Sequence, residues 1–311
     1  MKIFQLFLLS LIALGFASCD DDDDVINFLS GNEPVDVTGI TYIERENEDF
    51  SSVYGDIRSA IAAAGPEVSI LAEANHRSAT STIGLELRPT RTIMFGNPRL
   101  GTPLMMENML IGLDLPQKIV VYQAEDDDII AAYNSTDYLS SRYNVTGPNA
   151  DFATIGTALE NFVQAGTDEE TENSADVEVD QNVGIVTMTT NDSVDVVYDR
   201  LVEALSSTSG VRVVAELDHS ENARSVGMTL PASRIVFFGN PNFGGPLLQD
   251  EQAAGLDIPL SILVFDNGTN TTIAYNDPQW LADRFDIDDE LPVIGQLEDL
   301  YERVTGVAMG N

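Results

Sequence analysis

The same pattern of residues occurs twice in this chain, at a constant spacing of 143 residues. The chain has two histidines, His76 and His219, and they lie at this spacing. Phe-Gly-Asn-Pro occurs at residues 95–98 and again at 238–241. Similarity within a chain at one fixed spacing indicates a structural unit that is used more than once. The sequence therefore predicts two copies of one domain.

The first 19 residues have the features of a bacterial lipoprotein signal peptide. Lys2 is followed by an apolar stretch over residues 3–16, which is too short to cross a hydrocarbon core of about 30 Å. Small residues then precede Cys19, the only cysteine, in a pattern that resembles a lipobox. We therefore predict that residues 1–18 are removed and that Cys19 carries the lipid. An ordinary secretory signal or a buried free thiol are the alternatives.

An acidic segment follows Cys19 directly. Residues 20–24 are all aspartate, and adjacent carboxylates repel one another and stay solvated. We expect residues 19–36 to form a tether between a membrane and the folded part. The acidic run resembles the surface-export signal of Bacteroidetes lipoproteins, and a simple spacer is the alternative interpretation. The predicted location is extracytoplasmic, lipid-anchored in the cell envelope, at the outer membrane and exposed on its surface.

The formal net charge of −36 limits the classes of partner. Such a surface repels phosphate groups, so nucleic acid is excluded as a partner. Because no cysteine follows Cys19, disulfides and thiolate metal sites are excluded as well. The expected partners are a membrane through lipidated Cys19, the second copy of the domain, and a small-molecule ligand. No motif indicates a cofactor.

We place the first domain at residues 37–166 and the second at residues 182–307. Residues 167–181 lie between them, are rich in Asp and Glu, and contain no basic residue. This composition predicts a flexible, charge-extended linker.

Each domain contains the same order of predicted elements. β-Branched runs predict strands, and apolar residues spaced three and four apart predict helices. Strands joined by hairpins, with helices between other strands, indicate an α+β fold with a largely antiparallel sheet. The predicted strands are residues 39–45, 68–74, 92–95, 118–122 and a strand ending at Tyr133, and residues 184–190, 211–217, 235–238, 261–265 and a strand ending at Tyr275; the predicted helices are residues 50–64 and 194–205, with further helices beginning near Ser135 and Asp277.

Several short motifs occur in the same order in both domains. Glu-x-x-His is followed by Phe-Gly-Asn-Pro, Gly-x-Pro-Leu, Gly-Leu-Asp-x-Pro and Tyr-Asn. In this combination the chain resembles the domain-of-unknown-function family 302, over nearly all of its length apart from the tether and the linker. The resemblance implies a compact α+β domain that tends to pair, so the two copies are expected to form an internal pseudo-dimer. It implies no activity, because none is established for the family.

The two Glu-x-x-His motifs are the first candidates for a functional site. They place Glu73 near His76 and Glu216 near His219. A glutamate that orients an imidazole can create a general base, and both groups can bind metals. At the end of a strand, however, residues i and i+3 point to opposite faces, so joint action requires a turn between them. The third interpretation is structural, with the pair holding a loop.

These interpretations lead to residue predictions. The candidate catalytic residues are Glu73, His76, Glu216 and His219, and the candidate metal ligands are the same four with Asp218. We predict that each histidine lies within hydrogen-bond reach of its own glutamate or of Arg91 or Arg234. We also predict that the Phe-Gly-Asn-Pro turn lies next to it.

Other polar residues that both copies share are candidate ligand-binding residues. An arginine can bind an anionic ligand through its planar fork, although pairing with Glu73, Glu216, Asp114 or Asp257 is the alternative in so acidic a chain. An asparagine before proline can cap the next segment, and a tyrosine at a strand end can border a pocket or pack in the core. The predicted ligand-binding residues are Arg91, Arg234, Asn97, Asn240, Tyr133 and Tyr275.

The leading hypothesis for function is an envelope lipoprotein that binds a ligand or a partner. A hydrolase or lyase-type enzyme that uses the two Glu-x-x-His pairs is the alternative, and a metal-handling protein is the second alternative. No Gly-x-Ser-x-Gly, P-loop or dinucleotide motif is present. The sequence therefore leaves open whether the protein is an enzyme.

Overall fold

The computed structural model describes residues 37–148, 150–174 and 177–310. The predicted signal peptide, Cys19 and the acidic tether lie outside the described residues. Within the described ranges, no helix is long and apolar enough to span a bilayer. The described residues fall within one compact unit.

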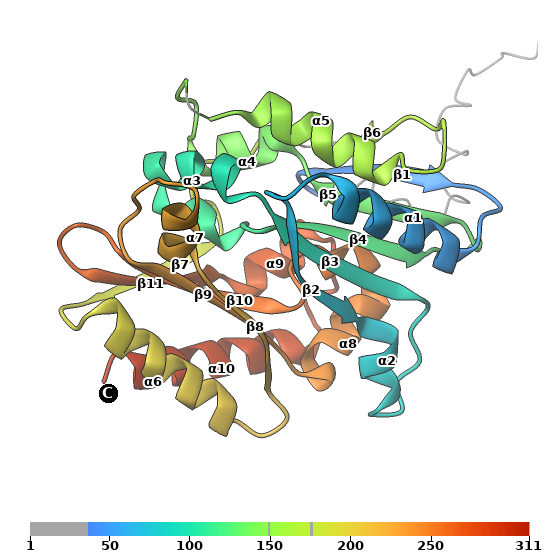
Figure 1. Cartoon of the computed structure of the whole chain (residues 1–311). Helices are drawn as coiled ribbons and strands as arrows, with labels where there is room; N and C mark the ends of the chain where they lie inside the picture. The colour runs from blue at the N-terminus through green and yellow to red at the C-terminus, as the bar shows by residue number, and fades with distance from the viewer. Residues whose placement is uncertain (1–36, 149, 175–176, 311) are drawn as a thin grey trace, which may run out of the picture. The chain divides into compact units, whose positions relative to one another are not determined.

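The first repeat is an antiparallel sheet with packed helices (Figure 1). The strands lie in the order β2-β3-β4-β5-β1-β6 across the sheet. The strands are β1 (Ile40–Arg45), β2 (Ser69–Asn75), β3 (Thr90–Gly96), β4 (Gln117–Gln123), β5 (Ile129–Asn134) and β6 (Glu172–Asn173); the helices are α1 (Phe50–Ala63), α2 (His76–Ser81), α3 (Pro98–Glu107), α4 (Thr136–Tyr143), α5 (Phe152–Val163) and the 3-10 helix η1 (Met109–Leu113).

The second repeat has the same plan, with strand order β7-β11-β10-β9-β8 and antiparallel pairing throughout. The predicted α+β fold is therefore confirmed. The strands are β7 (Ile185–Thr190), β8 (Arg212–Asp218), β9 (Ser233–Gly239), β10 (Leu260–Asp266) and β11 (Thr271–Asn276); the helices are α6 (Val194–Ser207), α7 (His219–Ser225), α8 (Pro241–Asp250), α9 (Pro278–Arg284), α10 (Pro292–Ala308) and the 3-10 helix η2 (Gln252–Leu256).

The Asn-Pro motif ends a strand and begins a helix in both repeats. The side-chain oxygens of Asn97 and Asn240 accept hydrogen bonds from the backbone N–H two residues further on, at 2.9 and 3.0 Å. Each proline is then the first helical residue, where its missing N–H leaves no bond unmade. Local sequence thus fixes where α3 and α8 begin.

The linker between the repeats differs from the prediction. Residues Glu172–Asn173 form β6, which pairs with β1 at the edge of the first sheet. The Thr41 hydroxyl donates to the Asn173 side chain at 2.7 Å, and the Ile40 amide donates to Ser174 Oγ at 3.1 Å. An edge strand offers unpaired backbone groups that a passing segment can bind. This part of the predicted flexible linker is therefore an edge strand of the sheet.

Alternate residues of the central strands belong to different hydrophobic clusters. Ile119 and Val121 of β4 pack in the core of their own repeat. Val120 and Tyr122, which point the other way, share a cluster with Val236 and other residues of the second repeat. One face of the sheet is therefore covered by its own helices and the other by the second repeat. The internal pseudo-dimer is confirmed, and double-sided burial explains why these strands are continuously apolar.

The helices after the last strand also differ from the prediction of one per repeat. Two helices follow β5 and two follow β11. In Figure 1, α1 and α5 lie beside the first sheet, and α6 and α10 lie beside the second. Between the repeats, α3 contacts α7, α2 contacts α8, and each 3-10 helix packs on the strands of the other repeat.

Candidate functional site

Glu73 lies on the side of β2 that faces α1, and its carboxylate is engaged there. The Tyr54 hydroxyl donates to Oε2 at 2.5 Å, and Arg58 donates to Oε1 at 2.9 Å. The Arg91 guanidinium lies 3.5 Å from Oε2 and 3.7 Å above the centroid of the Tyr54 ring. Burial acts to raise the pKa of Glu73, but the hydrogen bonds from Tyr54 and Arg58 outweigh burial and lower it. The polar partners of this glutamate come from α1 and β3.

The second repeat contains a similar cluster. The Tyr198 hydroxyl donates to Glu216 at 3.0 Å, and the Arg234 guanidinium lies 3.8 Å above the Tyr198 ring. Arg234 is 3.6 Å from both Asp195 and Asp199 on α6. Both predicted anion-binding arginines therefore stack on a tyrosine and pair with acidic side chains of their own repeat.

His76 is buried where the two repeats meet. Its Nε2 lies 2.9 Å from the Thr92 hydroxyl, which donates to the carbonyl oxygen of Gly255 in the second repeat at 2.7 Å. A hydroxyl has one proton, so Nε2 must be the donor to Thr92. Burial lowers the pKa of His76 to about 4, which leaves the ring neutral at pH 7. The prediction that His76 bonds to Glu73 or Arg91 is wrong.

The local backbone explains this correction. Asn75 ends β2 and caps α2, and its side chain accepts a hydrogen bond from the Ser78 amide at 2.9 Å. His76 therefore becomes the first residue of a helix that leads away from the strand. The turn carries the imidazole toward the second repeat, while Glu73 keeps the strand orientation toward α1.

His219 occupies the equivalent position but lacks the bridging hydroxyl. Ile235 stands where the first repeat has Thr92. The Nε2 atom of His219 is buried and has no hydrogen-bond partner among the described residues. Burial lowers the pKa of His219 to about 4, while a hydrogen bond with the backbone of Gly112 and the charge of Asp218 act in the opposite direction. No hydrogen bond within the described ranges joins His219 to Glu216 or Arg234, so that prediction is wrong as well.

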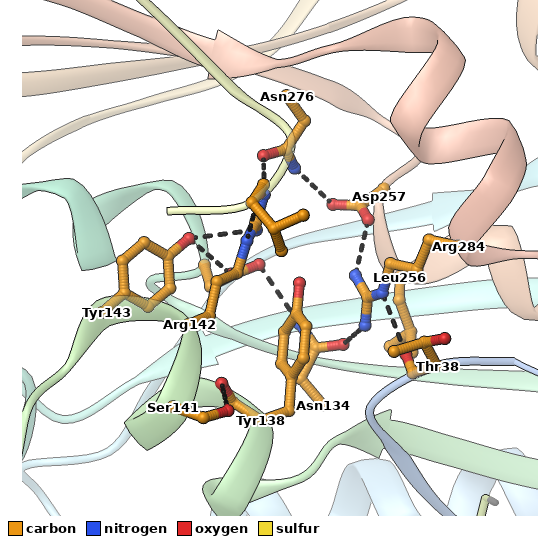
Figure 2. A network of polar contacts seen from close by, with 12 residues as sticks. Thr38, Asn134, Tyr138, Ser141, Arg142, Tyr143, Leu256, Asp257, Asn276 and Arg284 are labelled. Atoms are coloured by element: carbon orange, nitrogen blue, oxygen red, sulfur yellow. Dashed lines mark hydrogen bonds and ion pairs between the residues drawn. The ribbon is translucent and has the colours of Figure 1, made fainter. Parts of the chain in front are cut away.

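A closed ring of six buried side chains connects the two repeats (Figure 2). Each repeat contributes an aspartate that follows its 3-10 helix, an asparagine at the end of a strand, and an arginine on the next helix. They are Asp114, Asn134 and Arg142 in the first repeat and Asp257, Asn276 and Arg284 in the second.

Each arginine of this ring bridges the repeats. Arg142 donates to Asp114 at 3.1 Å and, across the interface, to Asn276 at 2.8 Å. Arg284 donates to the aspartate of its own repeat at 2.8 Å and, across the interface, to Asn134 at 2.7 Å. Each asparagine amide then donates to the aspartate of its own repeat, at 3.2 and 3.1 Å. Burial acts to raise the pKa of Asp114, but the charges of the two arginines lower it.

An aromatic side chain of the other repeat stacks on each of these two arginines. The Arg142 guanidinium lies 4.0 Å from the centroid of the Trp280 ring, and the Arg284 guanidinium lies 4.3 Å from the centroid of the Tyr138 ring. Gly39 and Gly184 directly precede the first strand of each repeat, with φ of 80° and 64°. A Cβ atom at either glycine would collide with the aromatic ring of the same repeat. The glycines are therefore required both by the left-handed backbone and by the close approach of the ring.

Sequence reasoning missed the role of these arginines. Asp114 and Asp257 were considered only as alternative partners of Arg91 and Arg234. Their actual partners recur at a spacing of 142 residues, one fewer than the histidines, because the hairpin between β10 and β11 is one residue shorter than that between β4 and β5. A comparison of the copies that allowed this deletion could have found them.

The two predicted ligand-binding tyrosines lie in the hydrophobic cores. Burial raises the pKa of Tyr133 to about 12, and the Tyr275 ring stacks on Tyr301 with centroids 4.3 Å apart. Neither tyrosine lines the two cavities described next.

The first cavity lies between the first repeat and α7 of the second, and has a volume of about 170 Å³. Apolar side chains of β3, α3 and α5 form most of its wall, and no Asp, Glu, Lys or Arg of the described residues lines it. Asn97, Gln117, His219 and Asn222 contribute polar groups. The Nε2 atoms of Gln117 and His219 are buried without a hydrogen-bond partner among the described residues. We name this space the His219 cavity.

A second cavity, of about 390 Å³, occupies the equivalent place in the other repeat. It is lined by His76 and Asn75 from the first repeat and by the Phe-Gly-Asn-Pro turn of the second, including Asn240. Each histidine thus lies beside such a turn, as predicted, but the turn belongs to the other repeat. We name this space the His76 cavity.

The predicted metal ligands are not brought together. Among the described residues, the group of three carboxylates or imidazoles close enough to share one ion is Glu44, Asp126 and Asp128. It contains neither histidine. Asp218 instead caps α7, where its side chain accepts a hydrogen bond from the Glu221 amide at 2.8 Å.

With this geometry described, comparison with known proteins assigns the chain to a family. The chain belongs to the family described as domain of unknown function DUF302, whose model matches residues 42–165 and 186–306. The resemblance seen in the sequence is thereby confirmed, and both matched regions lie inside the two structural repeats.

Similar proteins include the fluoride-specific ion channel FluC 1 of Brucella suis biovar 1 (strain 1330) and FluC 2 of Brucella melitensis biotype 1. Each is 36% identical over 102 residues, which is 32% of this chain and 40% or 37% of the relative. The chain thus spans two fifths or less of these relatives. A solved structure, an uncharacterized conserved DUF302 protein from Bacillus stearothermophilus, matches 40% of this chain and 96% of its own at 17% identity and a TM-score of 0.35.

Proposed function

We propose that this protein is a ligand-binding module that holds a small molecule in the His219 cavity. The observation that supports this proposal concerns Gln117 and His219, which line the cavity and whose Nε2 atoms are buried without a hydrogen-bond partner among the described residues. Buried polar groups are nearly always hydrogen-bonded, and an unpaired one costs about 1–3 kcal/mol. A bound ligand would supply the missing partners.

The same geometry argues against the enzyme alternative. A hydrolase or lyase that used Glu-x-x-His would need its carboxylate beside the imidazole. Here Glu73 and Glu216 accept hydrogen bonds from tyrosines of α1 and α6, while the histidines face the other repeat. The metal-handling alternative has no support at the histidines, because no neighbours among the described residues form a ligand group with them.

A cavity-filling variant tests the proposal. Ala158 of α5 lines the His219 cavity, and Ala79 of α2 lines the His76 cavity. The full chain would be dialysed against a small-molecule extract of its host, and compounds released on denaturation would be identified by mass spectrometry. We expect wild type and Ala79→Phe to retain a compound that Ala158→Phe does not. Equal retention by both variants, or none by wild type, would contradict the proposal.

We further propose that the module is anchored to the extracytoplasmic envelope, at the outer membrane, by a lipid on Cys19. The support is the short apolar segment that ends at the only cysteine, followed by an acidic tether. More than one acyl chain would anchor the protein stably, whereas one alone binds reversibly.

Membrane fractionation tests the anchor. Cys19→Ser should move the protein from the membrane to the soluble fraction and abolish labelling by a clickable fatty acid, because no thiol remains to accept a lipid. Cys19→Ala provides a second variant without the hydroxyl. Membrane association that survives both changes would exclude the anchor while leaving the cavity proposal untouched.

A further inference from the structure

We infer that the ligand of the His219 cavity is a small, uncharged, mainly apolar molecule of about the size of a benzene ring that carries one hydroxyl group, and that one ligand binds per chain. This inference rests on the proposed function. It adds the chemical class and the stoichiometry, which follow from the size, the charge and the polar atoms of the cavity.

The volume of the cavity sets the size of the ligand. At about 170 Å³, the space is slightly larger than an apolar cavity of about 150 Å³ that holds a benzene molecule. The wall includes Phe95, Leu159 and Phe162, which give an apolar ring favourable contacts. A single six-membered ring with one small substituent fits this space.

The lining of the cavity selects for a neutral ligand. Within the part of the chain that the structure describes, no acidic or basic side chain lines it, and an ion that leaves water without a partner loses far more hydration energy than the cavity returns. His219 does not supply a positive charge at pH 7, since burial keeps the ring neutral. Carboxylates, phosphates and amines are therefore disfavoured.

The two unpaired nitrogen atoms define the polar group of the ligand. The amide nitrogen of Gln117 can only donate. The hydrogen bond with the backbone of Gly112 raises the pKa of His219, so the ring donates there, and it does so through Nδ1 because Nε2 has no partner among the described residues. Nε2 of the neutral ring is therefore an acceptor. A hydroxyl group can accept from Gln117 and donate to His219, which a carbonyl or a methyl group cannot do.

Divergence of the two repeats limits binding to one site. Leu260 stands at the position equivalent to Gln117, so the second repeat has no matching amide. The Nε2 atom of His76 is already bonded to Thr92. The His76 cavity therefore lacks both of the free nitrogen atoms that distinguish the His219 cavity.

Binding of simple probes to the full chain tests the inference. Phenol, toluene and benzoate would be titrated at pH 7.5 by calorimetry or by ligand-observed NMR. We expect phenol to bind about tenfold more tightly than toluene, at one molecule per chain, because two hydrogen bonds are added, and benzoate not to bind. Gln117→Leu, which introduces the residue found at position 260, should remove most of the preference for phenol and leave toluene binding intact.

The controls separate the inference from the proposal on which it rests. Toluene binding by Gln117→Leu shows that its cavity is intact, and Gln117→Met, of similar volume, replaces the variant if leucine prevents folding. Equal binding of phenol and toluene in wild type, tight binding of benzoate, or two phenols per chain would each overturn the inference while the cavity remains a binding site. If none of the three probes binds and wild type retains no compound from the host extract, the proposed function itself is wrong.

Discussion

At the scale of single residues, equivalent positions of the two repeats have acquired different partners. Asn108 caps η1, and its side chain accepts a hydrogen bond from the Leu110 amide at 3.0 Å. At the equivalent cap of η2 stands Glu251, which accepts from the Ala253 amide at 2.7 Å. Burial raises the pKa of Glu251 to about 7, with a further contribution from the charges of Asp250 and Asp286. The second 3-10 helix therefore has a cap that titrates near neutral pH.

This difference predicts a pH dependence of stability. The folded carboxyl holds its proton up to about pH 7, whereas the unfolded one loses it near pH 4.3. Between these values the folded state binds more protons, so the free energy of unfolding falls as pH rises through this window. Glu251→Gln should remove this component and leave the protein up to about 3–4 kcal/mol more stable than wild type at pH 8.

Urea unfolding at pH 5 and pH 8 would measure this effect. Glu203→Gln, which replaces an exposed glutamate of α6, is the matched control and should change neither value. A Glu251→Gln protein with the same difference between the two pH values as wild type would show that the cap does not titrate in this range. The histidines act in the opposite direction: their lowered pKa values reduce stability as pH falls from about 6.5 to 4.

At the scale of elements, the ends of strands and helices meet in the buried ring. The end of η1, the end of β5 and the helix α4 each supply one polar side chain, and the second repeat does the same. The side chains of Arg142 and Arg284 have no exposed area, so each charge depends entirely on its partners. Removal of one partner of a buried pair leaves the other charge uncompensated.

Replacement of Arg284 by methionine should therefore lower the free energy of unfolding by about 3–5 kcal/mol. The control is Arg88→Met, which breaks the exposed pair of Arg88 with Glu125 and should change stability by less than about 1 kcal/mol. The double change Arg284→Met with Asp257→Leu should cost less than the single change, since no buried charge remains alone. Denaturant titration measures all three, and a loss below about 1 kcal/mol for Arg284→Met would exclude an energetic role for the ring.

At the scale of the whole molecule, each repeat covers an apolar face of the other. Val120 and Ile130 lie in one cluster with residues of the second repeat, and Met94 packs with Leu263. Neither repeat can cover these faces with its own helices, which already pack on the opposite side of the sheet. Stability is therefore a property of the pair.

Separate expression of the two halves tests this view. Residues 37–181 and 182–311 should each unfold at a lower denaturant concentration than residues 37–311, and each should self-associate through its exposed apolar face. An equimolar mixture should form one-to-one heterodimers in size-exclusion chromatography and regain part of the lost stability. Halves that remain monomeric and unfold at the same midpoint as the whole would contradict a shared core.

Much of the fold was predictable because it depends on local pattern. The repeat predicted two domains, alternation and apolar runs predicted most strands to within two residues at the ends, and the asparagine before proline marked the start of α3 and α8. The repeat also indicated that His76 and His219 occupy one equivalent place in the two domains, whereas their burial is a finding of the structure.

The partners of these residues were decided only by the tertiary structure. Hydrophobic periodicity indicates that a face is buried but not which segment covers it. The packing of the second repeat on Val120 and the residues that line the His219 cavity were therefore not predictable from the sequence. Hydrogen-bond partners such as Arg284 and Asn134 are 150 residues apart, and packing of the repeats brings them together. The sequence by itself determined two copies of one α+β domain. The tertiary structure decided which side chains of the two copies are hydrogen-bonded to each other, because those bonds depend on contacts between segments that are distant in the chain.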